Sequence, residues 1–174
     1  MSEDDKKYYS SKQEQLVAKE LGGYPVRGSG ARPCAPGDVK TYDWLVECKT
    51  HAEPNHPIFF DIDVWKKICN EAMGISRKPV LVVDDGSQKI NKTWCLCKKI
   101  NINTTGLIVS DLPVKIRKNI SCKQDKLADK LKADSRGLIV PGKSFYTNIA
   151  YEVNWNGEDV LVMPFELFKE LFEK

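Results

Sequence analysis

The sequence lacks the long apolar run that a membrane-spanning helix needs. About 20 consecutive apolar residues cross a bilayer, and no stretch of the 174 residues approaches that length. The first seven residues, Met1 to Lys7, are acidic and then basic and contain no hydrophobic segment, so they do not resemble a secretory signal. We therefore expect an intracellular, cytoplasmic protein.

Histidine is scarce and the cysteines are not paired in sequence. The chain has two histidines and six cysteines, and none of the cysteines forms a C-x-x-C motif. Zinc sites and disulfide frameworks are therefore disfavoured, and we expect reduced thiols. The net charge is only +3, which neither requires nor excludes a nucleic-acid partner. Evidence for DNA binding has to come from local charge and from the site.

The sequence also has no internal repeat and no low-complexity tract, and its length suits one domain. The pattern predicts an α/β fold. A helix is expected to open at the capping-box sequence Ser11-Lys12-Gln13-Glu14 and to end at Gly22-Gly23. Two extended runs follow, Asp38 to Thr41 and Trp44 to Thr50, close enough together to form a hairpin.

A second helix is predicted between Asp61 and Gly74. Apolar residues recur there at helical spacing and predict a buried stripe, formed by Val64, Trp65, Ile68, Cys69 and Ala72. Val80 to Val83 is a continuous apolar run typical of an interior strand. Trp94 to Cys97 is expected to be its neighbour in the sheet.

The pattern is weaker beyond Lys98. A basic helix is expected over 123–132, and Pro164 suits the first turn of a last helix. The apolar residues of that last helix are Phe165, Leu167, Phe168 and Leu171. The remaining strands are expected at 107–109, 138–140 and 160–163.

The hairpin brings together residues that can perform chemistry. Side chains alternate along a strand, so Glu47 and Lys49 should share one face, with Cys48 on the other. If 42–43 is a two-residue turn, the register pairs Val39 with Val46 and sets Asp38 opposite Glu47. Two carboxylates at opposed positions repel each other. A divalent cation between them would convert this repulsion into ligation.

The donor set suits Mg²⁺, with Mn²⁺ as a substitute. The carboxylates of Asp38 and Glu47, with the main-chain carbonyl of Cys48, would leave coordination sites for a phosphate and a water. The ion would lower the pKa of that water for attack on phosphorus, and Lys49 would hold the nucleophile or neutralise the developing charge. The alternative is structural: Asp38 as a turn residue, and Glu47 and Lys49 as a solvated strand face.

Glu14 has two interpretations that the sequence leaves open. It could complete the capping box by accepting from the backbone N–H of Ser11. It also lies at i, i+4 and i+7 with Ala18 and Leu21, on an otherwise apolar stripe, from which it could reach the metal.

A loop rich in glycine and arginine precedes Asp38. Its backbone N–H groups and guanidiniums could clamp a phosphate, and the residues concerned are Arg27, Gly28, Ser29, Gly30 and Arg32. The alternative is an ordinary turn with solvated arginines. Other basic clusters, at 98–99, 115–118 and 123–132, are equally compatible with DNA contacts and with solvated faces.

Together these residues resemble the archaeal and phage Holliday junction resolvases of the PD-(D/E)XK superfamily, over residues 11 to 85. The resemblance implies a restriction-endonuclease-like mixed central sheet flanked by helices over 1–98. Residues 99–174 have no counterpart in that family, and we expect them to form a C-terminal α+β extension packed on the same domain. It also implies that Glu14, Asp38 and Glu47 bind Mg²⁺, that Lys49 assists attack, and that Ser29 touches the scissile strand. Gly37-Asp38 stands where the family often has Pro-Asp.

The expected function is therefore a Mg²⁺-dependent DNA endonuclease acting on four-way junctions, working as a homodimer as members of that family typically do. Two alternatives stay open. The same chemistry could serve a nickase, a restriction-type nuclease or a phage replication nuclease. A non-catalytic DNA-binding protein on a nuclease scaffold is the other.

Overall fold

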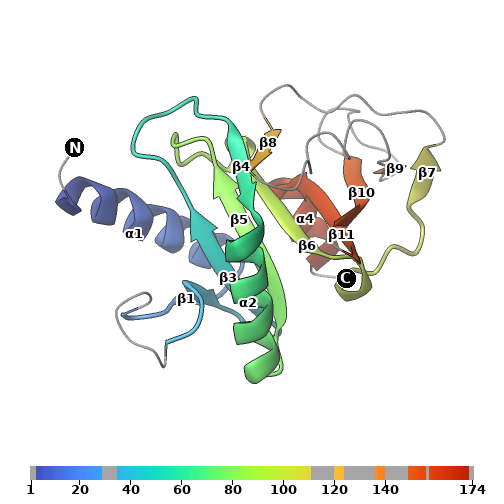
Figure 1. The fold of residues 1–174 in the computed structure, drawn as a ribbon, viewed down its shortest axis with the longest axis horizontal. Helices are drawn as coiled ribbons and strands as arrows, with labels where there is room; N and C mark the ends of the chain where they lie inside the picture. The colour runs from blue at the N-terminus through green and yellow to red at the C-terminus, as the bar shows by residue number, and fades with distance from the viewer. Residues whose placement is uncertain are drawn as a thin grey trace.

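The computed structural model of the chain describes residues 3–28, 35–110, 120–123, 136–139, 149–155 and 157–172. These residues form a nine-stranded mixed sheet with helices on both faces (Figure 1), which confirms the predicted α/β class. Across the sheet the strands are β1 (Tyr24–Pro25), β2 (Val39–Lys40), β3 (Trp44–Lys49), β5 (Lys78–Asp84), β6 (Thr93–Lys98), β11 (Glu158–Pro164), β10 (Ile149–Trp155), β9 (Arg136–Ile139) and β7 (Ile108–Ser110).

The first helix, α1 (Glu3–Glu20), begins eight residues before the predicted capping box. The prediction was wrong because acidic residues at positions 3–5 occupy the first turn, where negative charge complements the helix dipole. Ser11 is therefore in the middle of the helix. The predicted end is confirmed: Gly22 has a φ of +62°, and the N–H of Gly23 donates to the carbonyl of Ala18 at 2.8 Å, as in a Schellman motif.

The hairpin register is as predicted at Val39 and Lys40, but the expected pair of Asp38 with Glu47 is not formed. Val39 pairs with Val46 and Lys40 with Leu45, and the N–H of Thr41 donates to the carbonyl of Trp44 at 3.1 Å to close the turn. Strand β1, which the sequence did not suggest, adds on the outer side of β2 and forms one edge of the sheet.

The second helix, α2 (Ile62–Gly74), connects β3 to the parallel strand β5. The side chain of Asp61 caps it by accepting from the N–H groups of Asp63 and Val64. The predicted stripe is present, since Trp65, Ile68 and Ala72 are buried and the other two predicted members are partly buried. A short strand before the helix, β4 (Ile58–Asp61), pairs in parallel with β8 (Ile120–Lys123) in a separate two-stranded sheet.

The sheet separates two apolar cores. On one face, α1 and α4 (Phe165–Phe172) cover Trp44, Val46 and Cys48. On the other face, α2 and β4 cover Leu45 and Leu81. Figure 1 shows α2 on the near side of the sheet and α4 on the far side. The odd and even residues of β3 thus belong to different layers, as strand alternation requires.

Residues after 98 continue the same sheet. Strand β11 pairs with β6, which confirms the strand expected at 160–163, and strands also occur at the two other predicted places, as β7 and β9. The four apolar residues predicted for the last helix are all buried. Strand β10 was not predicted. Lys123 ends a strand, not a helix, and the rest of the expected basic helix lies outside the described residues.

Among the described residues, no helix combines the length and the apolar character needed to cross a bilayer.

Candidate active site

Strand β3 brings Glu47 and Lys49 together on the α2 side of the sheet. Their ion pair measures 2.7 Å from Nζ to Oε1, and the side chains are 4% and 47% exposed, respectively. A nearly buried carboxylate thus meets a cation whose side chain reaches solvent. The charge of Lys49 compensates the hydration that the Glu47 side chain loses at this depth.

Asp38 contacts the same strand through its side chain. Its Oδ2 accepts a hydrogen bond from the backbone N–H of Cys48 at 2.8 Å, while its own N–H donates to the carbonyl of Val46 at 2.7 Å. Strand β2 begins one residue later, at Val39. Asp38 is therefore not a ladder partner of Glu47. Its carboxylate lies against the backbone between Glu47 and Lys49.

The backbone of Cys48 points toward Asp38. In a strand, the N–H and C=O of one residue project to the same side, so the carbonyl of Cys48 faces the side on which its N–H meets Asp38. The paired part of β2 ends before this point. The thiol of Cys48 points into the opposite core, where burial raises its pKa well above the ordinary value and keeps it neutral. The carbonyl is therefore the group of Cys48 that can serve the site.

The backbone conformation at position 37 excludes proline before Asp38. Its φ of +64° is inaccessible to proline, whose ring fixes φ near −65°. Its N–H also donates to Oε2 of Glu71 at 3.0 Å, a bond that proline could not make. An added Cβ would lie 2.6 Å from Cδ1 of the buried Leu45. The hydrogen bond from Gly37 to Glu71 thus connects the backbone before Asp38 to helix α2.

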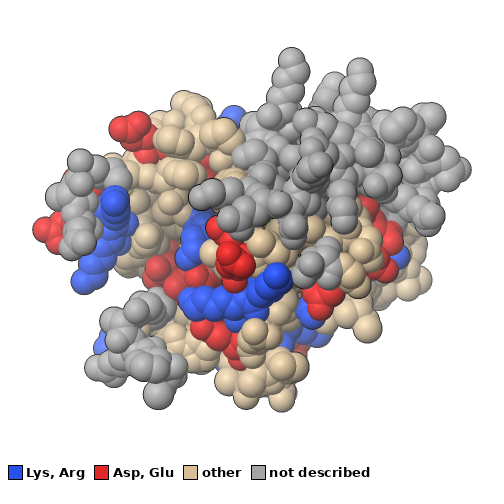
Figure 2. Space-filling view, viewed as in Figure 1, with Lys and Arg blue, Asp and Glu red and all other residues tan. Residues whose placement is uncertain are grey.

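Helix α2 contributes two charged residues that the sequence did not single out. Lys67 lies 3.6 Å from Glu47 and 3.7 Å from Glu71, so it links the strand acid to the acid that holds Gly37. An i, i+4 Lys–Glu pair is common on a helix surface. Lys67 also reaches Glu47 because α2, which connects the parallel strands β3 and β5, packs against β3. Figure 2 shows acidic and basic side chains gathered around α2.

Helix α1 closes the site from the other side with Gln13 and Glu14. Gln13 is 1% exposed, and its Nε2 donates to the carbonyl of Lys49 at 3.0 Å. Glu14 is half-buried beside it. Burial first, and then the charges of Asp38 and Glu47, raise the pKa of Glu14 to about 7, against the lowering effect of Lys49. The capping role is excluded by the position of the helix start, and Glu14 belongs electrostatically to the acidic cluster.

Lys49 stays protonated in this surrounding. Burial alone would lower its pKa, but the charge and hydrogen bond of Glu47 and the charge of Asp38 raise it above the ordinary value. A lysine held in its cationic form cannot accept a proton near neutral pH. Lys49 can therefore act as a fixed positive charge and not as a general base.

The donor set fits a hard divalent cation. Two carboxylates on one strand pair, a half-buried third carboxylate and a backbone carbonyl supply oxygen ligands of the kind that Mg²⁺ and Mn²⁺ prefer. Burial is the first cause of the raised pKa of Glu14, and the charges of Asp38 and Glu47 add to it; a cation would relieve this second, electrostatic part. In the described part of the chain, no three histidine, cysteine or acidic side chains stand in ligating geometry. Glu14, Asp38 and Glu47 are therefore neighbours, but their carboxylates do not meet at one point as the ligands of a bound ion would.

The predicted phosphate clamp is described only at its start. The N–H of Val26 donates to the carbonyl of Asp38 at 2.8 Å, which fixes the chain just before Arg27 and Gly28 beside the acidic cluster. Arg27 is exposed, and Gly28 has a φ of +80°. Ser29, Gly30 and Arg32 lie outside the described residues.

Of the other basic clusters, the structure describes the one at 98–99, and both of its lysines are paired. Lys98 and Lys99 form ion pairs of 2.6 Å with Glu158 and Glu152, so this cluster is largely neutralised. The clusters at 115–118 and 124–132 lie outside the described residues. Four cysteines in the described ranges, Cys48, Cys69, Cys95 and Cys97, are free thiols, as expected.

Two histidines follow Lys49 in the loop after β3. The rings of His51 and His56 stack at 4.3 Å between centroids, and the N–H of His56 donates to the carbonyl of Asp85. The two rings therefore contact each other, and the backbone of His56 is bonded to the residue that follows β5.

Comparison of the chain with models of known protein families, with characterised proteins and with solved structures found no match. The functional argument accordingly depends on the geometry of the site and on its chemistry.

Proposed function

We propose that the protein is a Mg²⁺-dependent DNA endonuclease whose active site is formed by Asp38, Glu47 and Lys49, with Glu14 as an additional acid. One observation carries this proposal. A buried carboxylate paired with a cationic lysine, and a second carboxylate held by the backbone between them, lie at the end of one strand.

Each residue of the proposed site would have its own role. Asp38 and Glu47, with the carbonyl of Cys48, would hold the ion, and Glu14 would contribute as its proton is lost. Bound there, Mg²⁺ supplies a Lewis acid and a water of lowered pKa. Lys49 would place its fixed charge against the phosphate oxygens, where negative charge grows in the transition state.

The local topology supports a restriction-endonuclease-like core. A helix, a hairpin carrying Glu47-Cys48-Lys49, a crossover helix and a parallel strand follow in order as α1, β2–β3, α2 and β5. This order matches the resemblance drawn from the sequence. The same resemblance favours branched DNA as the substrate and a homodimer as the active form.

Cleavage assays test the proposal. Wild-type protein with Mg²⁺ is incubated with a labelled four-way junction, a flap, a nicked duplex and a linear duplex. We expect cleavage that requires the metal and is fastest on the junction. Glu47→Gln should reduce the rate by about 10³-fold or more, because the lost ligand charge acts directly on the transition state.

Glu152→Gln is the matched control. It makes the same change and also breaks an ion pair with a lysine, but at Lys99, on the far part of the sheet. Cleavage by this variant should stay within a few-fold of wild type. Absence of cleavage on every substrate with Mg²⁺ and Mn²⁺ would refute the nuclease, and preference for linear duplex would refute the junction assignment alone.

A further inference from the structure

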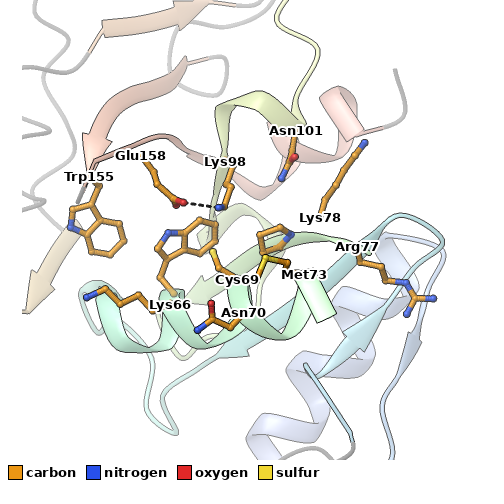
Figure 3. A pocket seen from close by; sticks show the side chains of 12 residues that line it. Lys66, Cys69, Asn70, Met73, Arg77, Lys78, Lys98, Asn101, Trp155 and Glu158 are labelled. Carbon is orange, nitrogen blue, oxygen red and sulfur yellow. Dashed lines mark hydrogen bonds and ion pairs between the residues drawn. The ribbon is translucent and has the colours of Figure 1, made fainter. Parts of the chain in front are cut away.

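Two pockets border helix α2, and they differ in how accessible their walls are. The larger, of about 660 Å³, is drawn in Figure 3. Its two indoles, Trp65 and Trp155, are 2% and 1% exposed, and Lys98 in its wall is paired with Glu158. The aromatic surface of the larger pocket is therefore covered, and one of its cations is already engaged.

The smaller pocket, of about 180 Å³, lies at the carboxyl ends of the parallel strands β3 and β5. Lys49 and Val83 contribute to it from these strands. Phe59 contributes from β4 and Val64 from α2. Both of these apolar side chains are only half-buried, so their surfaces are accessible to a ligand. In open α/β sheets, the crevice beyond the carboxyl ends of the strands is a common place for a ligand.

Lys49 belongs both to this pocket and to the proposed active site. It is the last residue of β3, and its side chain is 47% exposed while its Nζ pairs with Glu47. Strand alternation puts Leu81 and Val83 on the α2 side of the sheet, in the same layer as this ion pair. A group bound in the pocket would therefore lie beside a phosphate held at Lys49.

The size of the smaller pocket suits one aromatic ring. A cavity of about 150 Å³ takes up benzene, and a pyrimidine base is a six-membered ring of similar bulk. A purine carries a second, fused ring. The volume of about 180 Å³ therefore favours a pyrimidine over a purine.

Two polar groups complete the lining. Asp61 caps α2 by accepting from the N–H groups of Asp63 and Val64. Both bonds end on Oδ1, and among the described residues none is donated to Oδ2. His51 is exposed, and its ring contacts that of His56. Burial first, and then the charge of His56, lower the pKa of His51, so its ring is neutral near pH 7 and carries one N–H donor.

We propose that the smaller pocket binds the cytosine base of the nucleotide whose phosphate lies at Lys49. The exocyclic amino group of cytosine would donate to Oδ2 of Asp61, as it does to acidic side chains elsewhere, and His51 would donate to an acceptor of the ring. Thymine carries a carbonyl oxygen in place of that amino group, and a carboxylate repels it. A base enters such a pocket by leaving the stack, which costs least in unpaired DNA. This inference rests on the proposed nuclease function.

Deoxycytidine tests the pocket independently of the metal site, because it carries no phosphate. The full chain in EDTA is titrated with deoxycytidine and with thymidine, and NMR follows the ring protons of the two histidines. We expect deoxycytidine to shift the His51 signals, assigned through His51→Gln, and to bind about tenfold more tightly than thymidine. Histidine signals that do not move, or equal affinities, would overturn the proposal.

Asp61→Asn changes the polar lining and keeps the helix cap, since asparagine is an equally good N-cap residue. An amide both donates and accepts, so this variant should bind the two nucleosides within about threefold of each other. Asp63→Asn is the matched control, because Asp63 is an exposed acid in the first turn of the same helix and lies outside the lining. It should keep the preference for deoxycytidine. Loss of the preference in both variants, or in neither, would refute the role of Asp61.

Cleavage mapping connects the pocket to the DNA strand. Four-way junctions with cytosine or thymine next to each cut site are incubated with Mg²⁺ and either wild type or Asp61→Asn. We expect wild type to cut about tenfold faster at cytosine and the variant to show no preference. Cleavage without base preference by a protein that binds deoxycytidine would overturn the assignment to the strand. Binding of deoxycytidine by a protein that cuts no DNA refutes the nuclease and not the pocket.

Discussion

Glu14 is the residue in the proposed site whose protonation should change near neutral pH. Its pKa is raised from 4.5 to about 7 by burial and by the neighbouring acids. A carboxyl whose pKa is higher in the folded state binds a proton preferentially on folding. Its contribution to stability is therefore fully present below about pH 4.5 and is lost as the pH rises through 7.

Glu14→Gln should reveal this linkage in metal-free protein. At pH 8 the variant should be more stable than wild type by an amount on the order of 1 kcal/mol, since solvent screens part of the repulsion at a half-buried group. At pH 4.5 the difference should vanish. Urea denaturation in EDTA at both pH values measures it, and a difference that does not change with pH would contradict the assignment.

Magnesium gives a second readout for the same variant. The ion would relieve the repulsion between the carboxylates in wild type. Mg²⁺ at a concentration of about 10 mM, which suits a site with few protein ligands, should therefore stabilise wild type more than Glu14→Gln at pH 8. Equal stabilisation of the two proteins would place Glu14 outside the metal site.

At the scale of elements, α2 holds the Asp38 turn through Glu71. Glu71→Ala removes the acceptor of the Gly37 N–H and one partner of Lys67. We expect the Mg²⁺ concentration for half-maximal cleavage to rise about 10- to 100-fold, the usual cost of losing a residue that orients a metal ligand. Glu166→Ala, an acid in the first turn of α4, is the control and should leave this concentration unchanged.

The loop after β3 depends on a close backbone approach at Gly86. Its φ is +88°, and an added Cβ would lie 1.9 Å from the carbonyl oxygen of Glu53. Gly106 has a similar φ of +83° with open space around it. Gly106→Ala should cost about 1–2 kcal/mol of unfolding free energy from the left-handed backbone alone, and Gly86→Ala about 3–5 kcal/mol because overpacking adds to it. Chemical denaturation measures the free energy of unfolding of both variants. Equal losses of unfolding free energy would mean that Gly86 does not contact the loop around Glu53.

The same scale shows which parts of the fold the sequence could predict. The hairpin register and the α2 stripe follow from local periodicity, and both are present. The start of α1 could not be found because its first turns are polar on every side, so no periodicity distinguishes them from a loop. Strand β1 is too short to leave a pattern.

The candidate site was predictable where it depends on one hairpin. Alternation sets Glu47 and Lys49 on one face, and the two-residue turn sets the pairs around Val39 and Lys40. Asp38 lies before the paired part of β2 and contacts the backbone of Cys48, not a position opposite Glu47. Lys67, Glu71 and Gln13 come from other elements, and their approach depends on how α1 and α2 pack across β3. That packing is tertiary, and the residue types alone carry no signal of it.

At the scale of the whole molecule, the C-terminal helix and the site-bearing strand share one core. Phe168 is fully buried and meets the ring of Trp44 edge-on at 5.1 Å, whereas the partly buried Phe172 lies 6.0 Å from it. Phe168→Ala should lower the free energy of unfolding by about 3–5 kcal/mol, and Phe172→Ala by clearly less.

Two probes can follow these variants during denaturation. Tryptophan fluorescence and far-ultraviolet circular dichroism should give coincident transitions for wild type and for Phe168→Ala, because the sheet runs without interruption from β3 to β11. Separate transitions would show that the C-terminal part unfolds independently.

The short strand at the margin of the sheet bears on how two copies could meet. Strand β1 is two residues long and ends in Pro25, which has no N–H to offer. Short, proline-bearing margins discourage another chain from extending a sheet. Strand addition by a second molecule is therefore disfavoured at this edge, which lies beside the hairpin that carries Asp38.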